Sequence, residues 1–309
     1  MLGPEMRGWA GPLLALLLGA GCVPLVPSDV RDVQIAVESR YSIYLLSGTG
    51  DRRRLLASRR TQVGAAPHQE LHDDYVAPSL SPDGSHVACI RLRNHGRYGR
   101  DVRVALPPEV IEVLIVRLAD RAERLVLSTP DHGRGGAGVL GPVWSRDGRR
   151  VFFGAEGRIW VHRIGDERPE SVATLPVSTR ATRHYLRVVR EGDRLVALLP
   201  GPSGSEDAIA EIDPATGAVT LLWSGPLSSS STRDVDRPLP APIAADVAEA
   251  LFGSPEWPVL APHPAPDRRV YFFERFRQGP LGRRWIAGYD RATGTEFEVR
   301  TMWHTFWWE

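Results

Sequence analysis

The densest group of potential metal ligands in the sequence is His68-x-Glu70-x-His72-Asp73-Asp74. In an extended segment alternate side chains point to the same side, so two histidines and a carboxylate would share one face. Imidazole and carboxylate groups bind zinc, but the helical H-E-x-x-H spacing of zinc hydrolases is absent and no second ligand group lies nearby in sequence. We therefore interpret the segment as a polar loop and predict no metal and no other cofactor.

Other signatures of catalysis are absent from the sequence. It contains no G-x-S-x-G nucleophile elbow, no glycine-rich phosphate loop and no C-x-x-C pair. Cys89 lies in the apolar run Val87–Leu92 without an evident activating partner, so we interpret it as a small buried hydrophobic residue. We predict no catalytic residue.

The second cysteine belongs to an N-terminal export signal. Arg7 precedes the apolar run Leu13–Leu18, and Gly19-Ala20-Gly21-Cys22 follows it. The apolar run is too short to span a bilayer and is typical of a cleaved secretory signal. The cysteine directly after small residues resembles a bacterial lipoprotein signal, although a plain secretory signal is the alternative.

The lipoprotein resemblance implies a signal peptide over residues 1–21, lipidation at Cys22 and a tether over residues 22–32. It implies a place in the bacterial cell envelope, with a lipid anchor at the outer membrane and periplasm or on the extracellular face. Since Cys22 would be lipidated, no disulfide with Cys89 is expected.

Repeated turn phrases predict the elements that position everything else. Ser81-Pro82-Asp83-Gly84 and Ser145-Arg146-Asp147-Gly148 each precede a strand-like run, and the turn D-x-A-T-G occurs at both Asp213–Gly217 and Asp290–Gly294. Glycine accepts positive φ and aspartate bonds to nearby backbone, so each phrase predicts a turn between antiparallel strands. In the third unit the strands are expected at Gly141–Ser145, Val151–Ala155, Arg158–Ile164 and Ser171–Leu175. Four-stranded units repeated in this way indicate an all-β fold, a β-propeller.

The pattern P-x-W-S-x-D-G with its apolar run at Pro142–Phe153, followed by D-x-x-T-G turns, resembles the TolB-like and WD-repeat-like propellers of bacterial envelopes. The resemblance covers roughly Val33–Met302 and implies one propeller domain over residues 33–309, with five blades visible and six possible. Such propellers host binding proteins and enzymes alike.

Two insertions and the C-terminal tail depart from the repeat. Residues 91–108 are expected to form a long Arg/Gly loop or an extended hairpin, and residues 226–256 a Ser/Pro-rich stretch followed by a short helix over Ile243–Phe252. The aromatic tail Trp303–Glu309 is predicted to supply the missing inner strand of the first blade, so that N- and C-terminal strands close the ring.

Loops that enter the inner strands of a propeller meet at one mouth of the channel. Here these are the loops around His72–Tyr75, Arg134–Gly136, Arg180–His184 and Glu256-Trp257. We predict that ligand-binding residues gather at this mouth, namely His72, Asp73, Asp74, Arg180, Arg183, His184, Glu256 and Trp257.

The charge and the motifs together favour a binding function. The formal net charge is only +1, so no bulk electrostatic field favours nucleic acid, and none is expected as a partner. We expect a cell-envelope lipoprotein whose propeller is a binding or scaffolding module for an envelope protein or a small polar ligand, bound to the membrane through its lipid anchor. The alternative is a propeller-type hydrolase or lyase with its active site at the channel mouth.

Overall fold

The computed structural model describes residues 33–39, 42–47, 53–58, 60–63, 70–97, 110–130, 140–175, 185–189, 193–200, 207–225, 243–252, 263–264, 269–277 and 283–299. Within these ranges the strands form five antiparallel sheets, here called blades A to E in chain order.

Blades A and B contain the N-terminal strands. Blade A consists of β1 (Gln34–Ser39), β2 (Ser42–Ser47) and β3 (Arg53–Ala57). Blade B consists of β4 (Arg60–Val63), β5 (Glu70–Leu80), β6 (His86–Arg97), β7 (Val110–Arg117) and β8 (Glu123–Pro130). In both blades the strands follow one another in chain order across the sheet.

Blades C, D and E each have four strands. Blade C consists of β9 (Leu140–Trp144), β10 (Arg150–Ala155), β11 (Arg158–Arg163) and β12 (Glu170–Thr174). Blade D consists of β13 (Tyr185–Val188), β14 (Leu195–Pro200), β15 (Asp207–Ile212) and β16 (Val219–Gly225). Blade E consists of β17 (His263–Pro264), β18 (Val270–Arg277), β19 (Arg283–Asp290) and β20 (Thr295–Glu298).

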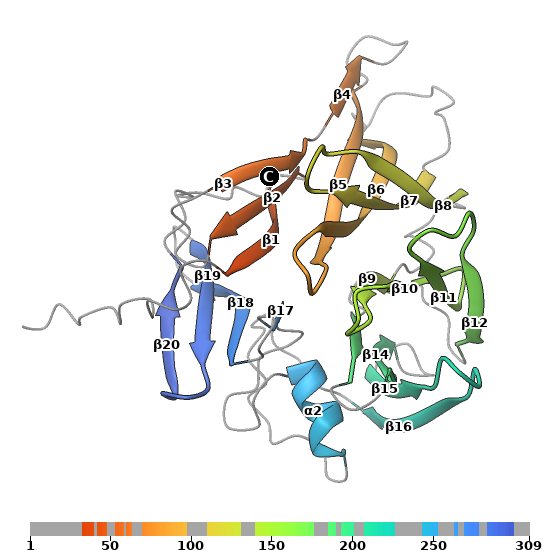
Figure 1. Cartoon of the computed structure of the whole chain (residues 1–309), viewed down its shortest axis with the longest axis vertical. Helices are drawn as coiled ribbons and strands as arrows, with labels where there is room; N and C mark the ends of the chain where they lie inside the picture. The colour runs from red at the N-terminus through yellow and green to blue at the C-terminus, as the bar shows by residue number, and fades with distance from the viewer. Residues whose placement is uncertain are drawn as a thin grey trace, which may run out of the picture.

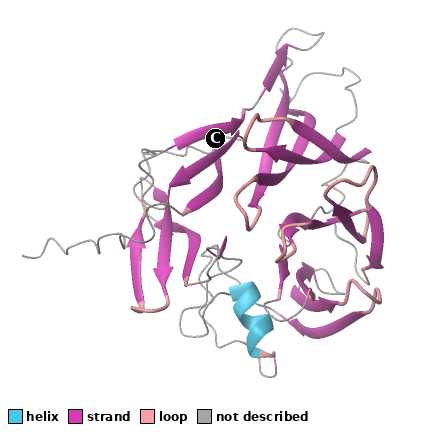
Figure 2. Ribbon diagram, in the orientation of Figure 1, coloured by secondary structure: helices cyan, strands magenta, loops and turns pink. Residues whose placement is uncertain are grey.

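The five sheets stand around a ring, with helix α2 (Ala245–Phe252) between blade D and blade E (Figures 1 and 2). The predicted β-propeller fold is therefore confirmed. The four strands expected in the third unit correspond to β9–β12 within one or two residues. The short helix expected near residues 243–252 is α2.

The S-x-D-G phrases form turns of the same construction in blades B and C. The hydroxyl of Ser81 donates to Asp83 Oδ1 at 2.6 Å, and that of Ser145 donates to Asp147 Oδ1 at 2.5 Å. Gly84 and Gly148 have φ of +69° and +68°, a conformation that a Cβ atom disfavours. These contacts fix the start of each second strand, because the same serine oxygens accept the backbone N–H of His86 and Arg150 at 2.9 Å.

Four of the five positions where neighbouring units meet are apolar. Here a seam is the contact between two such neighbours. One hydrophobic cluster joins blades A and B, a second joins B and C, a third joins C and D, and a fourth joins E and A. The fourth cluster brings Ile35 of β1 together with Phe297 of β20 and Val299, so it joins the two ends of the described chain.

Helix α2 occupies the fifth position. Val247 and Leu251 are fully buried against Val196, Leu198 and Ile209 of blade D. Toward blade E the described contacts are polar, because the hydroxyl of Tyr271 donates to Glu249 Oε1 at 2.6 Å and Arg291 donates to the same oxygen at 3.1 Å. The helix therefore packs on one blade and bonds to the other.

Residues 72–75, which were expected to form a loop, lie in a strand, and residues 91–97, which were expected to form either a loop or an extended hairpin, continue a strand. Residues 72–75 lie in β5, where Arg60–Val63 of β4 pairs with Glu70–Asp73. The stretch from Arg91 to Arg97 continues β6 and pairs with β7 as far as Arg93. In both cases the backbone hydrogen bonds to a neighbouring strand hold the segment in the sheet, although its polar side chains are typical of a loop. The expectations for residues 98–108, residues 226–242 and the tail Trp303–Glu309 concern residues outside the described ranges.

Candidate functional site

The predicted channel-mouth residues are only partly described. Asp73 and Asp74 are buried, at 7% and 0% exposure, so the prediction that they form an exposed loop is wrong. His72 lies in β5 opposite Thr61 of β4, and nothing is described of its side chain. Residues outside the described ranges are Cys22, Arg180, Arg183, His184, Glu256 and Trp257.

The described residues contain no group of three histidine, cysteine or acidic side chains that could hold a metal ion. Cys89 is fully buried in β6, and burial raises the pKa of its thiol to about 12. It therefore packs as the small hydrophobic residue that the sequence predicted.

Blade B carries a charge cluster on the face turned toward blade A. Arg91 Nε donates to Glu112 Oε2 at 2.6 Å, and Arg91 also reaches Glu123 at 3.1 Å. The hydroxyl of Tyr75 donates to Glu123 Oε1 at 3.2 Å, and the Arg91 guanidinium lies 6.0 Å from the centre of the Tyr75 ring. Since the Glu112 side chain is only 3% exposed, this cluster stabilises the sheet and is closed to a ligand.

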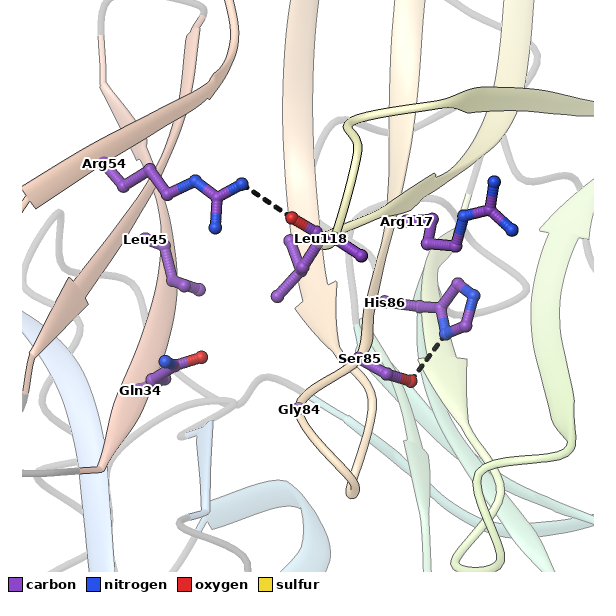
Figure 3. A pocket seen from close by; sticks show the side chains of 9 residues that line it. Gln34, Leu45, Arg54, Gly84, Ser85, His86, Arg117 and Leu118 are labelled. Carbon is purple, nitrogen blue, oxygen red and sulfur yellow. Dashed lines mark hydrogen bonds between the residues drawn. The ribbon is translucent and has the colours of Figure 1, made fainter.

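An open surface lies at the end of the blades where the turns after β5 and β9 and those after β7 and β11 meet. We call this end the turn face. A hollow of about 370 Å³, the A/B hollow, opens between blades A and B (Figure 3). Its lining consists of Gln34, Leu45, Arg54, Gly84, Ser85, His86, Arg117, Leu118 and Ala119.

Side chains from both blades converge on the A/B hollow. Arg54 of β3 extends to blade B, where it donates to the Leu118 carbonyl at 2.6 Å (Figure 3). Arg117 of β7 forms a two-bonded ion pair with Asp120, at 2.9 and 2.5 Å. Leu45 and Leu118 supply apolar surface, so the hollow combines cationic and apolar walls.

A second hollow, the B/C hollow, lies between blades B and C and has a volume of about 680 Å³. His86 lines both hollows, which makes them adjacent. The lining of the second consists of Asp83, His86, Asp147, Gly148, Arg149, Arg150, Arg163, Ile164 and Asp166.

A chain of two hydrogen bonds, from His86 to Ser85 and from Ser85 to Asp83, holds the imidazole of His86. Ser85 Oγ lies 2.7 Å from Asp83 Oδ2 and 2.7 Å from His86 Nδ1. Hydrogen bonds from Ser81 and Ser85 lower the pKa of Asp83 to about 2, so its carboxylate is ionised and can only accept. Ser85 must therefore donate its single proton to Asp83. Its oxygen then accepts the Nδ1–H of His86, which leaves Nε2 without a proton when the ring is neutral.

The positions of the hollows follow from the residue that ends each turn. Ser81 N–H bonds to the carbonyl of His86, Ser145 N–H to that of Arg150, and Val189 N–H to that of Arg194. In blade C this residue, Arg150, forms an ion pair with Asp193 of blade D. In blade D it is Arg194, which forms an ion pair with Asp246 of α2.

Blades A and B lack such an arginine at this place. Blade A presents Gln34, whose Oε1 would lie 4.0 Å from a Cβ placed on Gly84, and blade B presents His86. The A/B and B/C seams thus have no ion pair from this position within the described residues, and both remain hollow. Sequence analysis missed this site, although the replacement of Arg149-Arg150 by Ser85-His86 after the same turn was a readable signal.

Comparison with known proteins gives similar solved structures but no match that assigns an activity. No family model matches the chain, and no curated protein matches it. Among solved structures it is similar to TolB from Acinetobacter baumannii, with 15% identity over 88% of this chain and 64% of that one and a TM-score of 0.36. It is likewise similar to a protein assigned as TolB from Agrobacterium tumefaciens, with 18% identity over 62% of this chain and 60% of that one and a TM-score of 0.38.

A third similar structure is an oligogalacturonate lyase in complex with manganese, with 14% identity over 89% of this chain, 64% of that chain and a TM-score of 0.39. The chain thus spans 60% to 64% of the length of these structures. The identities and TM-scores are too low for any statement on function.

The described helix α2 is too short and too polar to cross a membrane, and no other helix is described.

Proposed function

We propose that this protein is a binding module of the cell envelope whose propeller holds a protein partner or a polar ligand on its turn face. The observation that supports this most is the pair of adjoining hollows around His86, to which blades A, B and C all contribute side chains. Concave sites where polar groups converge from separate elements are typical of ligand binding. Arg54, Arg117 and Arg149 would supply the polar contacts, and Leu45 and Leu118 the apolar ones.

The supporting argument is geometric. A residue presented by one loop can contact a ligand only from one side, whereas the turn face brings three blades to one surface. The hydrogen-bonded turns hold Ser85 and His86 in place before a ligand arrives, which lowers the entropy lost on binding. Ser85 donates a hydrogen bond to Asp83, and because the pKa of that carboxylate is lowered to about 2, it is too weak a base to activate the hydroxyl as a nucleophile.

A pull-down from the native envelope tests this proposal. The mature chain would be compared with Arg54→Ser/Arg149→Ser, which removes one cation from each hollow, and with the matched surface variant Arg158→Ser/Arg168→Ser. We expect the first variant to lose a partner that the other two retain. Equal recovery of the same partners by all three proteins would contradict a role for the turn face.

The channel mouth is the second surface to be tested. Asp73 and Asp74 are buried, so their substitution would disturb the sheet, and Arg183→Ser/His184→Ala is used instead to test binding at the predicted mouth. Loss of the partner in this variant, with binding retained in the turn-face variant, would place the site at the mouth.

We further propose that the module is anchored through lipidated Cys22, on the outer membrane or the outer cell surface. Cys22→Ser should move the protein from the membrane fraction to the soluble periplasmic or secreted fraction. A variant that stays on membranes after a high-salt wash would contradict lipid anchoring.

A further inference from the structure

The C/D seam shows how a carboxylate closes a junction between two turns. Arg150 ends the turn of blade C and forms an ion pair with Asp193. Asp193 directly precedes Arg194, the residue that ends the corresponding turn of blade D. The arginine of one blade is therefore paired with a carboxylate from the following blade.

The B/C seam has a histidine and an arginine at the corresponding places. His86 ends the turn of blade B, as Arg150 does in blade C. Arg149 directly precedes Arg150, as Asp193 precedes Arg194, so an arginine stands where the next seam has its carboxylate. Both side chains line the B/C hollow, and Arg149 forms no ion pair within the described residues. At this position the B/C seam therefore has a guanidinium in place of the carboxylate that closes the C/D seam.

Two of the three carboxylates that line this hollow are committed to their own turns. Asp83 accepts hydrogen bonds from Ser81 and from both the backbone and the side chain of Ser85. Asp147 Oδ1 accepts from Ser145 Oγ and from the backbone N–H of Arg149 at 3.0 Å. These bonds leave Oδ1 of either aspartate poorly placed to bridge to the facing blade.

We propose that the B/C hollow binds the carboxylate of a ligand, held between the guanidinium of Arg149 and the imidazole of His86. The ligand supplies the anion that Asp193 supplies at the C/D seam. The carboxylate comes either from a small free acid or from an acidic side chain of a peptide. This inference rests on the proposed binding function and names the chemistry of its ligand.

Binding must be coupled to a proton. Ser85 takes the Nδ1–H of His86, so Nε2 can donate to a carboxylate only when the ring is protonated. The charged groups around His86 are Asp83 in its own turn, Arg117 opposite it on β7, Asp147 and Arg149 in the turn after β9, Arg150 at the start of β10, Arg163 on β11 and Asp166 in the turn after β11.

The charge-reversal variant Arg149→Asp is the sharpest test. It places a carboxylate where blade D has Asp193, so the protein would satisfy His86 itself and exclude the ligand. Arg158→Asp, on β11 and outside the hollow, makes the same charge change as a control. Succinate and the blocked peptide acetyl-Gly-Glu-Gly-Glu-Gly-amide serve as probes, with succinamide as the uncharged comparison.

Binding would be measured by titration calorimetry, and the His86 ring by its carbon-bound proton resonance in NMR. We expect binding that weakens by up to about tenfold per pH unit as His86 loses its proton, is lost in Arg149→Asp and is kept in Arg158→Asp. Binding of succinate assigns a small-acid ligand, and binding of the peptide alone assigns an acidic protein segment.

The proposal is overturned if neither probe binds, if succinamide binds as well as succinate, or if both variants lose binding equally. It is likewise overturned if the affinity is independent of pH while the His86 resonance titrates. The envelope pull-down remains informative in each of these cases, since a partner captured through the turn face would show that the site binds by other contacts.

Discussion

The two D-x-A-T-G turns provide a matched pair in which backbone strain can be separated from crowding. Gly217 and Gly294 have φ of +73° and +66°, and each donates its N–H at 2.8 Å to the carbonyl of the aspartate that begins its turn. A Cβ on Gly217 would lie 2.5 Å from the backbone oxygen of Val172 in the neighbouring blade C. A Cβ on Gly294 would meet nothing within 4 Å.

Alanine should therefore cost unequal amounts at the two positions. A left-handed conformation costs a residue with a Cβ about 1–2 kcal/mol, and the smaller entropy of the unfolded alanine variant offsets about 0.4–1 kcal/mol of this. Gly294→Ala should thus destabilise the protein by about 1 kcal/mol. Gly217→Ala adds overpacking against a backbone oxygen, worth about 1–3 kcal/mol, because the main chain of β12 cannot turn aside as a side chain can.

Urea unfolding followed by circular dichroism measures the difference. The free energies of unfolding of wild type, Gly217→Ala and Gly294→Ala would be compared at equal m-value, so that a changed denatured state is recognised. Gly217→Ala should be the less stable variant by at least about 1 kcal/mol. Equal losses of stability in both variants would show that the D-x-A-T-G glycine is needed for its backbone conformation alone. Close packing of this turn of blade D against blade C would then make no contribution.

The remaining predictions concern buried charge, pH and the chain end. Glu112→Ala should destabilise the domain by about 3–5 kcal/mol, since it leaves Arg91 partly buried without its main partner. Substitution of an exposed glutamate, Glu170→Ala, is the control and should change the free energy of unfolding by less than about 0.5 kcal/mol. Similar losses of stability in the two variants would refute the argument. Burial and then the charge of Arg124 lower the pKa of His162 from 6.5, so stability is complete above that pH and falls as the pH drops toward the folded-state pKa. Denaturant midpoints between pH 7.5 and 4.5 check this, and His162→Leu should remove that part of the slope, whereas an unchanged slope would assign it to other groups. Deleting Trp303–Glu309 should lower the unfolding temperature of the whole domain, as expected if this tail completes blade A; a midpoint within a degree or two of the full chain would exclude closure by the tail.

The turn chemistry and the apolar runs were sufficient to predict blade C and helix α2. Both depend on neighbours within a few residues, such as Ser145 and Asp147, whose contacts are fixed by sequence distance alone. Local patterns of this kind are the part of a fold that a single sequence expresses most directly.

The polar strands were not predictable in the same way. Asp73 and Asp74 looked like a loop, yet β4 pairs with this segment and draws it into the sheet. The arginines after Ile90 were compatible with a loop or with an extended hairpin, and the strand register decides for the strand, since Arg91 lies opposite Glu112 on β7 and the two form a partly buried ion pair. Each of these outcomes depends on a partner that is distant in sequence and becomes visible only when the strand register is known.

The candidate site was missed because it is formed between blades. Nothing within blade B marks His86 as a binding residue; it becomes a candidate because Arg149 of the next blade lines the same hollow and because Arg150 and Asp193 form an ion pair at the following seam. A comparison of the residues that follow identical turns would have drawn attention to it. It would not have shown that a hollow of about 680 Å³ results.

The cluster that joins β1 to the end of blade E also has a consequence for the order of folding. The strands within each blade are near neighbours along the chain, so each blade can form early from local contacts. Ile35 and Val299 come from opposite ends of the described chain, and their meeting closes a loop that contains nearly all of it. Since closing a longer loop costs more entropy, this seam should form last and open first, and amide hydrogen exchange in β1 and β20 should outpace exchange in β10 and β14.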